Sequence, residues 1–379
     1  MASSRRPLPA ELSLPQVDLV EREATIPVVA ERSSSAAEPS SSIHDALLDP
    51  DRIAALSLCD RGLTTYNPDS FLADGLRVRG RNLGLIAAPM ILLFCWGVAW
   101  GILLDHFEPA RALLLPLGDV FAPLLTTVSF LLVFRLGRAA VRFWDARAAC
   151  GKMVELCRVL ASDTGVVCAS VPELRDEFAR WIGVFPIAVK NFLRPAGPSH
   201  DRAAEIGTLL TAAETDELLN PDIYAPILVL NRMRQAAFRV SAEIHTDTAV
   251  RSLVYRELNE GINTLTGAFG ACERINATPL PFVYVAHLRT FLLVYLGIWY
   301  MEALAAHGWP ALPGLVLSSW ALLGIEAAAI ECERPFRRRS NHLPLGRFAV
   351  VTARNVAQTL KNTAHAPASH SQALRNVKV

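Results

Sequence analysis

The stretch TTVSFLLVFRLGRAAVRFWDAR, residues 126–147, changes character at its midpoint. Up to Phe134 its side chains are apolar enough to lie in lipid, whereas four arginines and an aspartate follow from Arg135 onward. This pattern predicts a membrane helix that ends at a charged boundary. Phe130 and Phe134 lie about one helical turn apart inside the apolar half. Their rings therefore face lipid, pack in a bundle core or line a path for ions, and the stretch alone leaves all three open.

The composition indicates that this apolar stretch is one of several. Of the 379 residues, 52% are apolar and only 19% are charged, and the mean hydropathy of +0.29 is high for a soluble protein. Such a chain needs an apolar solvent for part of its surface. The net charge of +1 gives no attraction to nucleic acid, so no nucleic-acid partner is expected.

Enzymatic and metal-binding motifs are absent from the sequence. It has no phosphate-binding loop, dinucleotide fingerprint, HExxH, nucleophile elbow or EF-hand loop. The seven cysteines have no metal-binding spacing and are interpreted as small buried hydrophobic residues. The chain is therefore expected to be neither an enzyme nor a metalloprotein, and to carry no cofactor.

Four runs reach the length that a helix needs to cross a membrane, about 20 residues. Arginines precede the first run and follow the second and fourth, whereas the short links within each pair carry one arginine between them. By the positive-inside rule, both termini and the long middle segment lie on the cytoplasmic or equivalent side of an integral, multi-pass protein. A chloroplast thylakoid membrane is the alternative location. The predicted spans are residues 83–104, 113–134, 279–300 and 310–330.

The remaining segments are predicted to be helical or without regular structure. Residues 135–278 place apolar residues at three- and four-residue steps and show no strand alternation, which indicates a water-exposed helical region. The fold class is thus all-α: a polytopic membrane protein with four transmembrane helices and a helical cytosolic or stromal region. Residues 1–65 are interpreted as a disordered tail or an organelle transit peptide, and residues 347–379 as a C-terminal tail of open role.

Two features inside the predicted spans have more than one interpretation. Four ionisable residues, Asp119, His287, Arg289 and Glu326, either line or brace an ion path or form pairs between helices. The GVAWG step at residues 97–101 allows two backbones to approach closely, either between subunits or within one chain. Contacts between the helices distinguish these possibilities.

Thr126, Phe130 and Phe134 share one face of the second predicted span, because a step of four residues drifts only about 40° around a helix. The edge of a phenyl ring is electropositive and its face is negative. Rings presented edge-on around an axis would therefore stabilise a partly dehydrated anion without a fixed charge that traps it. Cations would meet no ring of carboxylates at that position.

Three motifs resemble the bestrophin family. FRLGRAAVRFWDARAACGKMV, residues 134–154, is similar to the segment that follows the family's second helix. GACERINATPLPFVYVAHLRTFLLVY, residues 270–295, resembles the approach to its third span, and GIEAAAIECERPFRRRSNHLPL, residues 324–345, resembles the end of its fourth. The order and spacing of the motifs agree over roughly residues 80–361. The matching positions are Arg142, Trp144, Asp145, Arg147, Pro279, Pro281, Tyr284, Glu331, Pro335 and Phe336.

This resemblance implies a bestrophin-like channel domain over residues 66–346, assembled in the lipid membrane as a homopentamer around one central pore. Its neck would be lined by Thr126, Phe130 and Phe134, where threonine replaces the apolar residue usual in the family. A count back from the third-span motif places a cytosolic aperture at Ile262, in NEGINTL. A buried isoleucine of the helical region fits the same position.

The resemblance also implies passive conduction of chloride, with bicarbonate or nitrate as further permeant anions. No calcium clasp is expected, because Ca²⁺ prefers several carboxylates and three arginines at residues 337–339 replace the acidic run of the calcium-regulated branch. These arginines stop the fourth span or attract anions to the pore. One alternative is a proton-coupled or bicarbonate-handling secondary anion transporter that uses Asp119, His287 or Glu326. Another is a membrane scaffold without transport.

Overall fold

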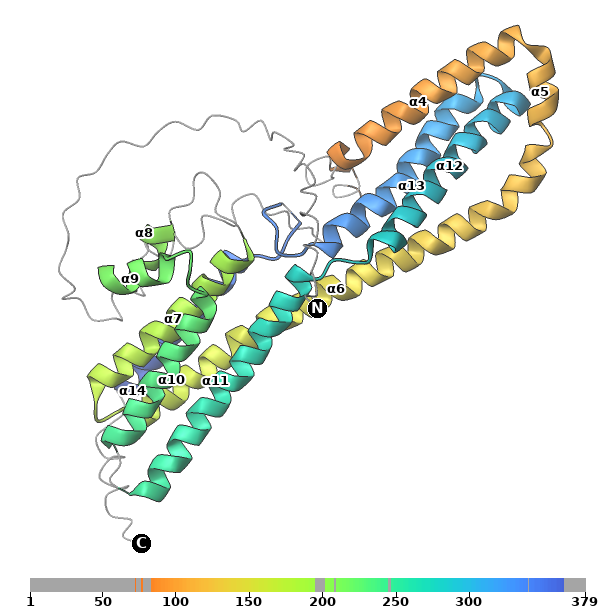
Figure 1. Cartoon of the computed structure of the whole chain (residues 1–379). Helices are drawn as coiled ribbons and strands as arrows, with labels where there is room; N and C mark the ends of the chain where they lie inside the picture. The colour runs from red at the N-terminus through yellow and green to blue at the C-terminus, as the bar shows by residue number, and fades with distance from the viewer. Residues whose placement is uncertain are drawn as a thin grey trace, which may run out of the picture. The chain divides into compact units, whose positions relative to one another are not determined.

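The computed structural model describes residues 83–194, 202–207, 209–244, 247–339 and 341–364, together with Leu72, Leu76 and Arg77. Every element of regular structure with described bounds is an α-helix, which confirms the predicted all-α fold (Figure 1). The tail predicted at residues 1–65 and the last residues, 365–379, lie outside the described part. The helices are α4 (Leu83–His106), α5 (Glu108–Leu114), α6 (Leu117–Val167), α7 (Pro172–Leu193), α8 (Arg202–Ile206), α9 (Ala212–Leu219), α10 (Ala225–Ile244), α11 (Thr248–Ala277), α12 (Phe282–His307), α13 (Ala311–Glu333) and α14 (Leu345–Ala364).

Four helices, α4, α6, α12 and α13, are long and apolar enough to cross a membrane. The second departs from its predicted limits of 113–134, because α6 begins at Leu117 and continues without a break to Val167. Its 51 residues extend over about 76 Å at about 1.5 Å each. The change to charged residues after Phe134 therefore marks a change of surroundings rather than a helix end. No proline follows, and alanine, leucine and arginine all favour helix.

The GVAWG step packs within one chain, which is one of the two interpretations left open by the sequence. A Cβ added to Gly97 would lie 2.7 Å from the ring of Tyr300 in α12. A Cβ on Gly101 would lie 2.7 Å from the ring of Trp309, whose indole nitrogen donates a 2.7 Å hydrogen bond to Asp105. The two glycines thus let α4 approach aromatic side chains that larger residues would displace.

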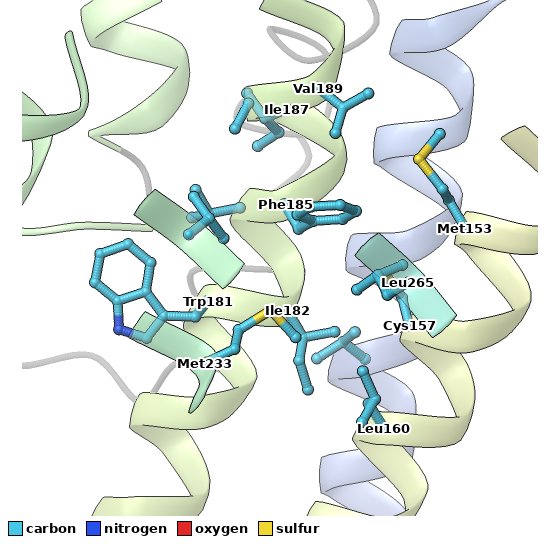
Figure 2. Close-up of a cluster of buried hydrophobic side chains, with 14 of the residues drawn as sticks. Met153, Cys157, Leu160, Trp181, Ile182, Phe185, Ile187, Val189, Met233 and Leu265 are labelled. Atoms are coloured by element: carbon cyan, nitrogen blue, oxygen red, sulfur yellow. The ribbon is translucent and has the colours of Figure 1, made fainter. Parts of the chain in front are cut away.

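The molecule has two hydrophobic cores, a smaller one among the membrane helices and a larger one in the water-exposed helical region. The second half of α6 lies against α11 and α14, and α7 lies against α10 and α14 (Figure 1). Every residue of α7 from Trp181 to Lys190 is buried, so this helix is covered on all sides. Figure 2 shows its rings and aliphatic side chains interleaved with Met153 and Cys157 of α6. The one charged residue of this stretch, Lys190, pairs with Glu205 of α8.

Helix α14 occupies part of the segment that the sequence analysis assigned to a C-terminal tail. Residues 345–364 form one amphipathic helix against α6 and α7. Its buried face includes Ala349, Ala353, Val356 and Leu360, which recur at three- and four-residue steps. Small side chains on this face allow a close approach of the backbones, and up to Ala364 the helix belongs to the packed region.

Candidate pore-lining face of α6

One face of α6 is exposed along almost the whole helix, and the opposite face is buried. The residues on the first face are all exposed: Thr126, Phe130, Phe134, Gly137, Val141, Trp144, Ala148, Glu155 and Val159. Those on the opposite face are all buried: Val128, Leu132, Arg135, Ala139, Ala146, Met153 and Leu160. The helix therefore presents a continuous surface, from the membrane span to the water-exposed region, that no other described part of the chain covers.

The three predicted neck residues lie on this exposed face. Phe130 is 61% exposed and Phe134 is 50% exposed, and Thr126 is exposed one turn earlier. The ring centroids of Phe130 and Phe134 are 4.5 Å apart with an interplanar angle of 63°, an edge-to-face contact. The two phenylalanines are thus not part of the bundle core of one subunit. The two rings therefore face either lipid or a space enclosed by further copies of the chain.

A buried ion-pair network lies on the side of α6 opposite the exposed face. Arg135 has no exposed surface, and its Nη2 lies 2.6 Å from Oε2 of Glu333, at the end of α13. Its Nε lies 3.3 Å from Glu326 of the same helix, and Arg289 of α12 donates to that carboxylate at 2.9 Å. Charges buried in this way are stable only when they are paired. The network therefore joins α6, α12 and α13 directly beneath Phe134.

These contacts distinguish the interpretations of the ionisable residues in the spans. Arg289 and Glu326 form a pair between helices, as one of the two alternatives predicted. His287 is exposed and stacks on Phe291 with a centroid distance of 6.4 Å. Asp119 is exposed in the first turn of α6, where a carboxylate is favoured by the helix dipole. The four side chains therefore do not form one chain of polar groups across the bundle.

The three sequence motifs meet at Glu333. From the first motif, the Nε of Arg142 donates a 2.8 Å hydrogen bond to the backbone oxygen of Glu333, and its Nη2 donates to that of Ile275. From the second, the backbone N–H of Leu280 donates to the carboxylate of Glu333 at 3.3 Å. Arg135 completes the set. Residues distant in sequence thus fix the point where α6, α11, α12 and α13 come together.

The other residues of the first two motifs have separate placements. Trp144 and Asp145 are exposed on α6, and the guanidinium of Arg147 lies 4.9 Å from the ring centre of Phe348 in α14, a cation–π contact. Pro279 and Pro281 are exposed in the link between α11 and α12, where Pro281 precedes the first turn of α12. Tyr284 is half-buried in that first turn. The two prolines and Tyr284 shape the link between α11 and α12. Together with the three α6 residues they do not gather into a second site.

The third motif forms the turn that follows α13. Pro335 and Phe336 are buried, and the backbone oxygen of Phe336 accepts a 2.8 Å hydrogen bond from Nε of Arg194 at the end of α7. Glu331 accepts from Arg339 at 3.0 Å, and its other oxygen lies 3.4 Å from Nε2 of His342. The turn is therefore tied both to α7 and back to α13.

The structure buries Ile262, the residue that the sequence analysis assigned to a cytosolic aperture. Its side chain has no exposed surface and belongs to the core that α6, α7 and α11 share. Assembly of further copies only buries more surface, so a side chain without exposed surface in one subunit lines a pore only if the helices around it rearrange. The count that suggested this position fixes distance along the chain, but it does not fix rotation around α11. Its burial favours the other interpretation of the sequence, a buried isoleucine, and the aperture stays a prediction.

Sequence reasoning missed the buried partners of this site. Arg135 was interpreted only as part of the positive flank, and Glu333 was not singled out, although they are separated by 198 positions and share a 2.6 Å contact. The available signal was the placement of each at a polarity boundary, Arg135 after the second apolar run and Glu333 after the fourth. A charge at a span boundary also occurs on an exposed flank, so the pairing itself was not predictable.

Comparisons with known proteins agree with the motifs. The sequence model of a family described as Bacterial/Fungal Bestrophin protein matches residues 75–358. A voltage-dependent anion channel-forming protein of Nostoc sp. is 29% identical over 287 residues, which cover 74% of this chain and 88% of the relative. A protein of the same description from Synechocystis sp. is 26% identical over 294 residues, covering 76% and 90% of the two chains.

Solved structures show the same fold. The crystal structure of a bacterial bestrophin homolog from Klebsiella pneumoniae has a TM-score of 0.63 to this chain at 20% identity. The similarity covers 74% of this chain and 100% of that one. A single-residue mutant of the same homolog has a TM-score of 0.62 at 21% identity, and the similarity covers 72% and 98% of the two chains. The described helices are thus arranged as in these proteins.

Proposed function

The chain belongs to the bacterial and fungal bestrophin family, and we propose that five copies surround one central pore that conducts anions passively. Chloride is the first permeant ion to test. Curated relatives over most of this chain carry the name of voltage-dependent anion channel-forming proteins, which supports an anion channel in an integral membrane protein and not an enzyme. The pore, its five-fold symmetry and its neck are the parts that belong to the proposal.

The observation that carries the proposal is the uncovered face of α6. In the membrane span this face is apolar, with Phe130 and Phe134 projecting from it, and it continues past the charged boundary to Trp144 and Glu155. A surface meant only for lipid has no reason to stay uncovered where the helix enters water, because water-exposed apolar faces are normally buried. A face that lines a pore, or packs on neighbouring copies, accounts for both halves.

The neck would discriminate between ions by dehydration. Phe130 and Phe134 already meet edge to face within one subunit, so a ring of such pairs presents electropositive phenyl edges to the axis. No carboxylate shares this part of the exposed face, and the buried acids behind it, Glu326 and Glu333, are paired to arginines. A partly dehydrated anion is therefore favoured over a cation. Thr126 adds one hydroxyl on the side of the neck nearer the start of α6.

The experiment is planar-bilayer recording of the purified chain with anion substitution. Phe130→Ala and Phe134→Ala are expected to change the permeability ratio among chloride, bicarbonate and nitrate, because each removes a phenyl edge from the neck. Phe94→Ala in α4 is the matched control, since that ring is 47% exposed on another membrane helix. Unchanged ratios and conductance in both neck variants, with folded protein, would remove the neck assignment.

The five-fold assembly has its own test. Native mass spectrometry of the detergent-purified chain is expected to give a complex of five times 41.4 kDa, with detergent removed. A monomer or dimer under conditions that retain channel activity would contradict a central pore. Both chain termini are proposed to lie on the cytoplasmic-equivalent side, as the arginine distribution predicts.

Two further expectations stay part of the proposal. Currents are expected to be the same with calcium and with a calcium chelator, because Arg337 and Arg338 stand where carboxylates would be needed. A proton-coupled transporter is the alternative, and Glu326 is the acid best placed in the membrane region. Its carboxylate contacts Arg135 and Arg289, so it is already engaged in two ion pairs. Proton-coupled flux that Glu326→Gln abolishes, without single-channel currents, would favour the transporter.

A further inference from the structure

A cavity of about 240 Å³ lies where α13 ends, beside Leu85 in the first turn of α4 and Arg289 in the second turn of α12. Four arginines and two glutamates are among its lining residues, and we refer to it as the arginine cavity. The position is the membrane boundary, because α13 is a membrane helix and its last residue, Glu333, is the last before the polar turn. The charged lining residues are Arg289, Arg334, Arg337, Arg339, Glu331 and Glu333.

The two carboxylates of the arginine cavity already have partners. Glu333 pairs with Arg135 at 2.6 Å, and Glu331 accepts from Arg339 at 3.0 Å. By contrast, the guanidinium groups of Arg334 and Arg337 make no hydrogen bond or ion pair with any described residue. The cavity thus holds an excess of positive charge that the described residues do not neutralise.

The energetics of Arg337 agree with this excess. Partial burial lowers its pKa, and the nearby guanidiniums of Arg334 and Arg339 lower it further, against a smaller opposite effect of Glu331. Arginine nevertheless stays protonated in proteins, so the repulsion among the three side chains is a standing cost. A bound anion would relieve it. Planar guanidinium groups match the oxygens of a phosphate in a bidentate manner, which makes phosphate the best-fitting anionic group.

An apolar groove of about 550 Å³ adjoins the arginine cavity, and both include Glu331 in their walls. Its lining comes from the membrane helices: Leu83 and Ile86 of α4, Leu136 of α6, and Trp320 and Gly324 of α13. A cationic cavity at the membrane boundary beside an apolar groove at membrane depth fits an amphiphile. Its charged end and its hydrocarbon would be held by different walls.

We propose that the arginine cavity binds the phosphate group of an anionic phospholipid, and that the apolar groove receives one of its acyl chains. A free phosphate shares the chemistry of the headgroup but gains nothing from the groove. Basic pockets at the cytoplasmic boundary of membrane helices attract anionic lipids electrostatically as well. The proposal concerns lipid recognition and does not depend on which ion passes the pore.

The first test compares headgroups and arginines. The full chain in detergent is titrated with phosphatidylglycerol or with phosphatidylcholine of the same acyl chains, and binding is followed by native mass spectrometry. Phosphatidylglycerol is expected to bind about tenfold more tightly. Arg334→Gln and Arg337→Gln should each weaken it about tenfold, because each removes a charge-assisted contact to phosphate. Arg338→Gln is the matched control, since Arg338 lies between these positions and Arg339 in the same turn but outside the cavity wall, and less than about a twofold change is expected.

The second test separates a lipid from a free phosphate. Gly324 lines the apolar groove, and a Cβ added there meets nothing within 4 Å, so Gly324→Leu extends a side chain from an unobstructed position into the groove. It is expected to weaken phosphatidylglycerol about tenfold. Gly314→Leu, on the same helix and equally unobstructed, should leave binding unchanged. Inorganic phosphate is then titrated calorimetrically, and is expected to bind far more weakly than the lipid.

Three outcomes would overturn the proposal. Equal binding of the two lipids would mean that the cavity does not recognise an anionic headgroup. An equal loss in Arg338→Gln would reduce the effect to diffuse surface charge. Inorganic phosphate binding as tightly as phosphatidylglycerol, with no effect of Gly324→Leu, would identify a site for a soluble anion instead of a lipid.

Discussion

Phenylalanines have opposite surroundings in the two halves of this molecule. In the water-exposed region, Phe185 and Phe269 are buried, with ring centroids 6.5 Å apart and an interplanar angle of 79°. In the membrane span of α6, Phe130 and Phe134 make a similar edge-to-face contact, but each ring keeps half or more of its surface exposed. The local pairing of rings is thus the same, and only the coverage by other helices differs.

The difference shows which region buries its own apolar surface and which does not. The water-exposed region completes its own core, since α7 is covered by α6, α10 and α14 of the same chain. The outer face of α6 has no such cover within the described part of the chain. Exposed rings in a membrane span are compatible with lipid, but the same face stays open beyond the span, where lipid is absent. The proposed assembly of several copies would cover this face.

The largest expected effect tests the buried side of this comparison. Phe185→Ala removes a ring from a closed core and should lower the free energy of unfolding by about 4 kcal/mol, because it leaves a cavity. Phe130→Ala should lower it by less than about 1 kcal/mol in the same assay, since no core of the subunit surrounds that ring. Guanidinium titration of the detergent-solubilised chain, followed by tryptophan fluorescence, measures both. Equal losses would mean that the exposed ring packs more tightly than the subunit indicates.

The second prediction compares the buried face and the exposed side of α6. Arg135→Met leaves the carboxylates of Glu326 and Glu333 without their buried partner and should cost about 3 kcal/mol of unfolding free energy. Arg138→Met, on the exposed side three residues later, should change it by less than about 0.5 kcal/mol. The same denaturant titration applies. A small effect at Arg135 would indicate that the network is dispensable and that the membrane helices are joined by packing alone.

The sequence predicted the parts of the fold that depend on composition along the chain. Four spans followed from apolar length and flanking arginines, and the helical region followed from three- and four-residue steps. What it did not predict depends on rotation and on distant partners. The count that assigned Ile262 to an aperture does not specify which side of α11 faces the core, and the structure buries this side chain. Glu333 was missed because its partners, Arg135 and Arg142, come from a helix almost two hundred residues earlier.

Helix α14 is an intermediate case. Its apolar positions, from Ala349 to Leu360, already had helical spacing and lie on one face, but the low overall hydrophobicity of the segment led to its interpretation as a tail. Its burial became evident only through its contacts with α6 and α7. Helical spacing in a weakly apolar segment thus predicts a packed helix only when a complementary surface exists elsewhere in the chain.

The third prediction concerns close packing in the membrane bundle. Gly97→Ala places a Cβ 2.7 Å from the ring of Tyr300 and 2.9 Å from Leu312, so either these two side chains or α4 itself must shift. Overpacking of this kind should cost about 2 kcal/mol of unfolding free energy. Gly84→Ala in the same helix is the control, because nothing lies within 4 Å of its added Cβ. If Gly97→Ala were as well tolerated as Gly84→Ala, the close approach of α4 would not be required.

The fourth prediction has the smallest expected effect and tests most directly what covers the exposed face of α6. Gly137 lies on that face one turn after Phe134, and an added Cβ meets nothing within 4 Å in the subunit. By helix propensity alone, Gly137→Ala should raise the free energy of unfolding by about 0.5–1 kcal/mol. The same sign is expected in a pore, where the position faces water. A loss of stability, together with fewer intact assemblies by native mass spectrometry, would mean that a neighbouring copy approaches the backbone there. The exposed face of α6 would then be an interface between subunits, and the phenyl rings one turn above it would not surround a path for ions.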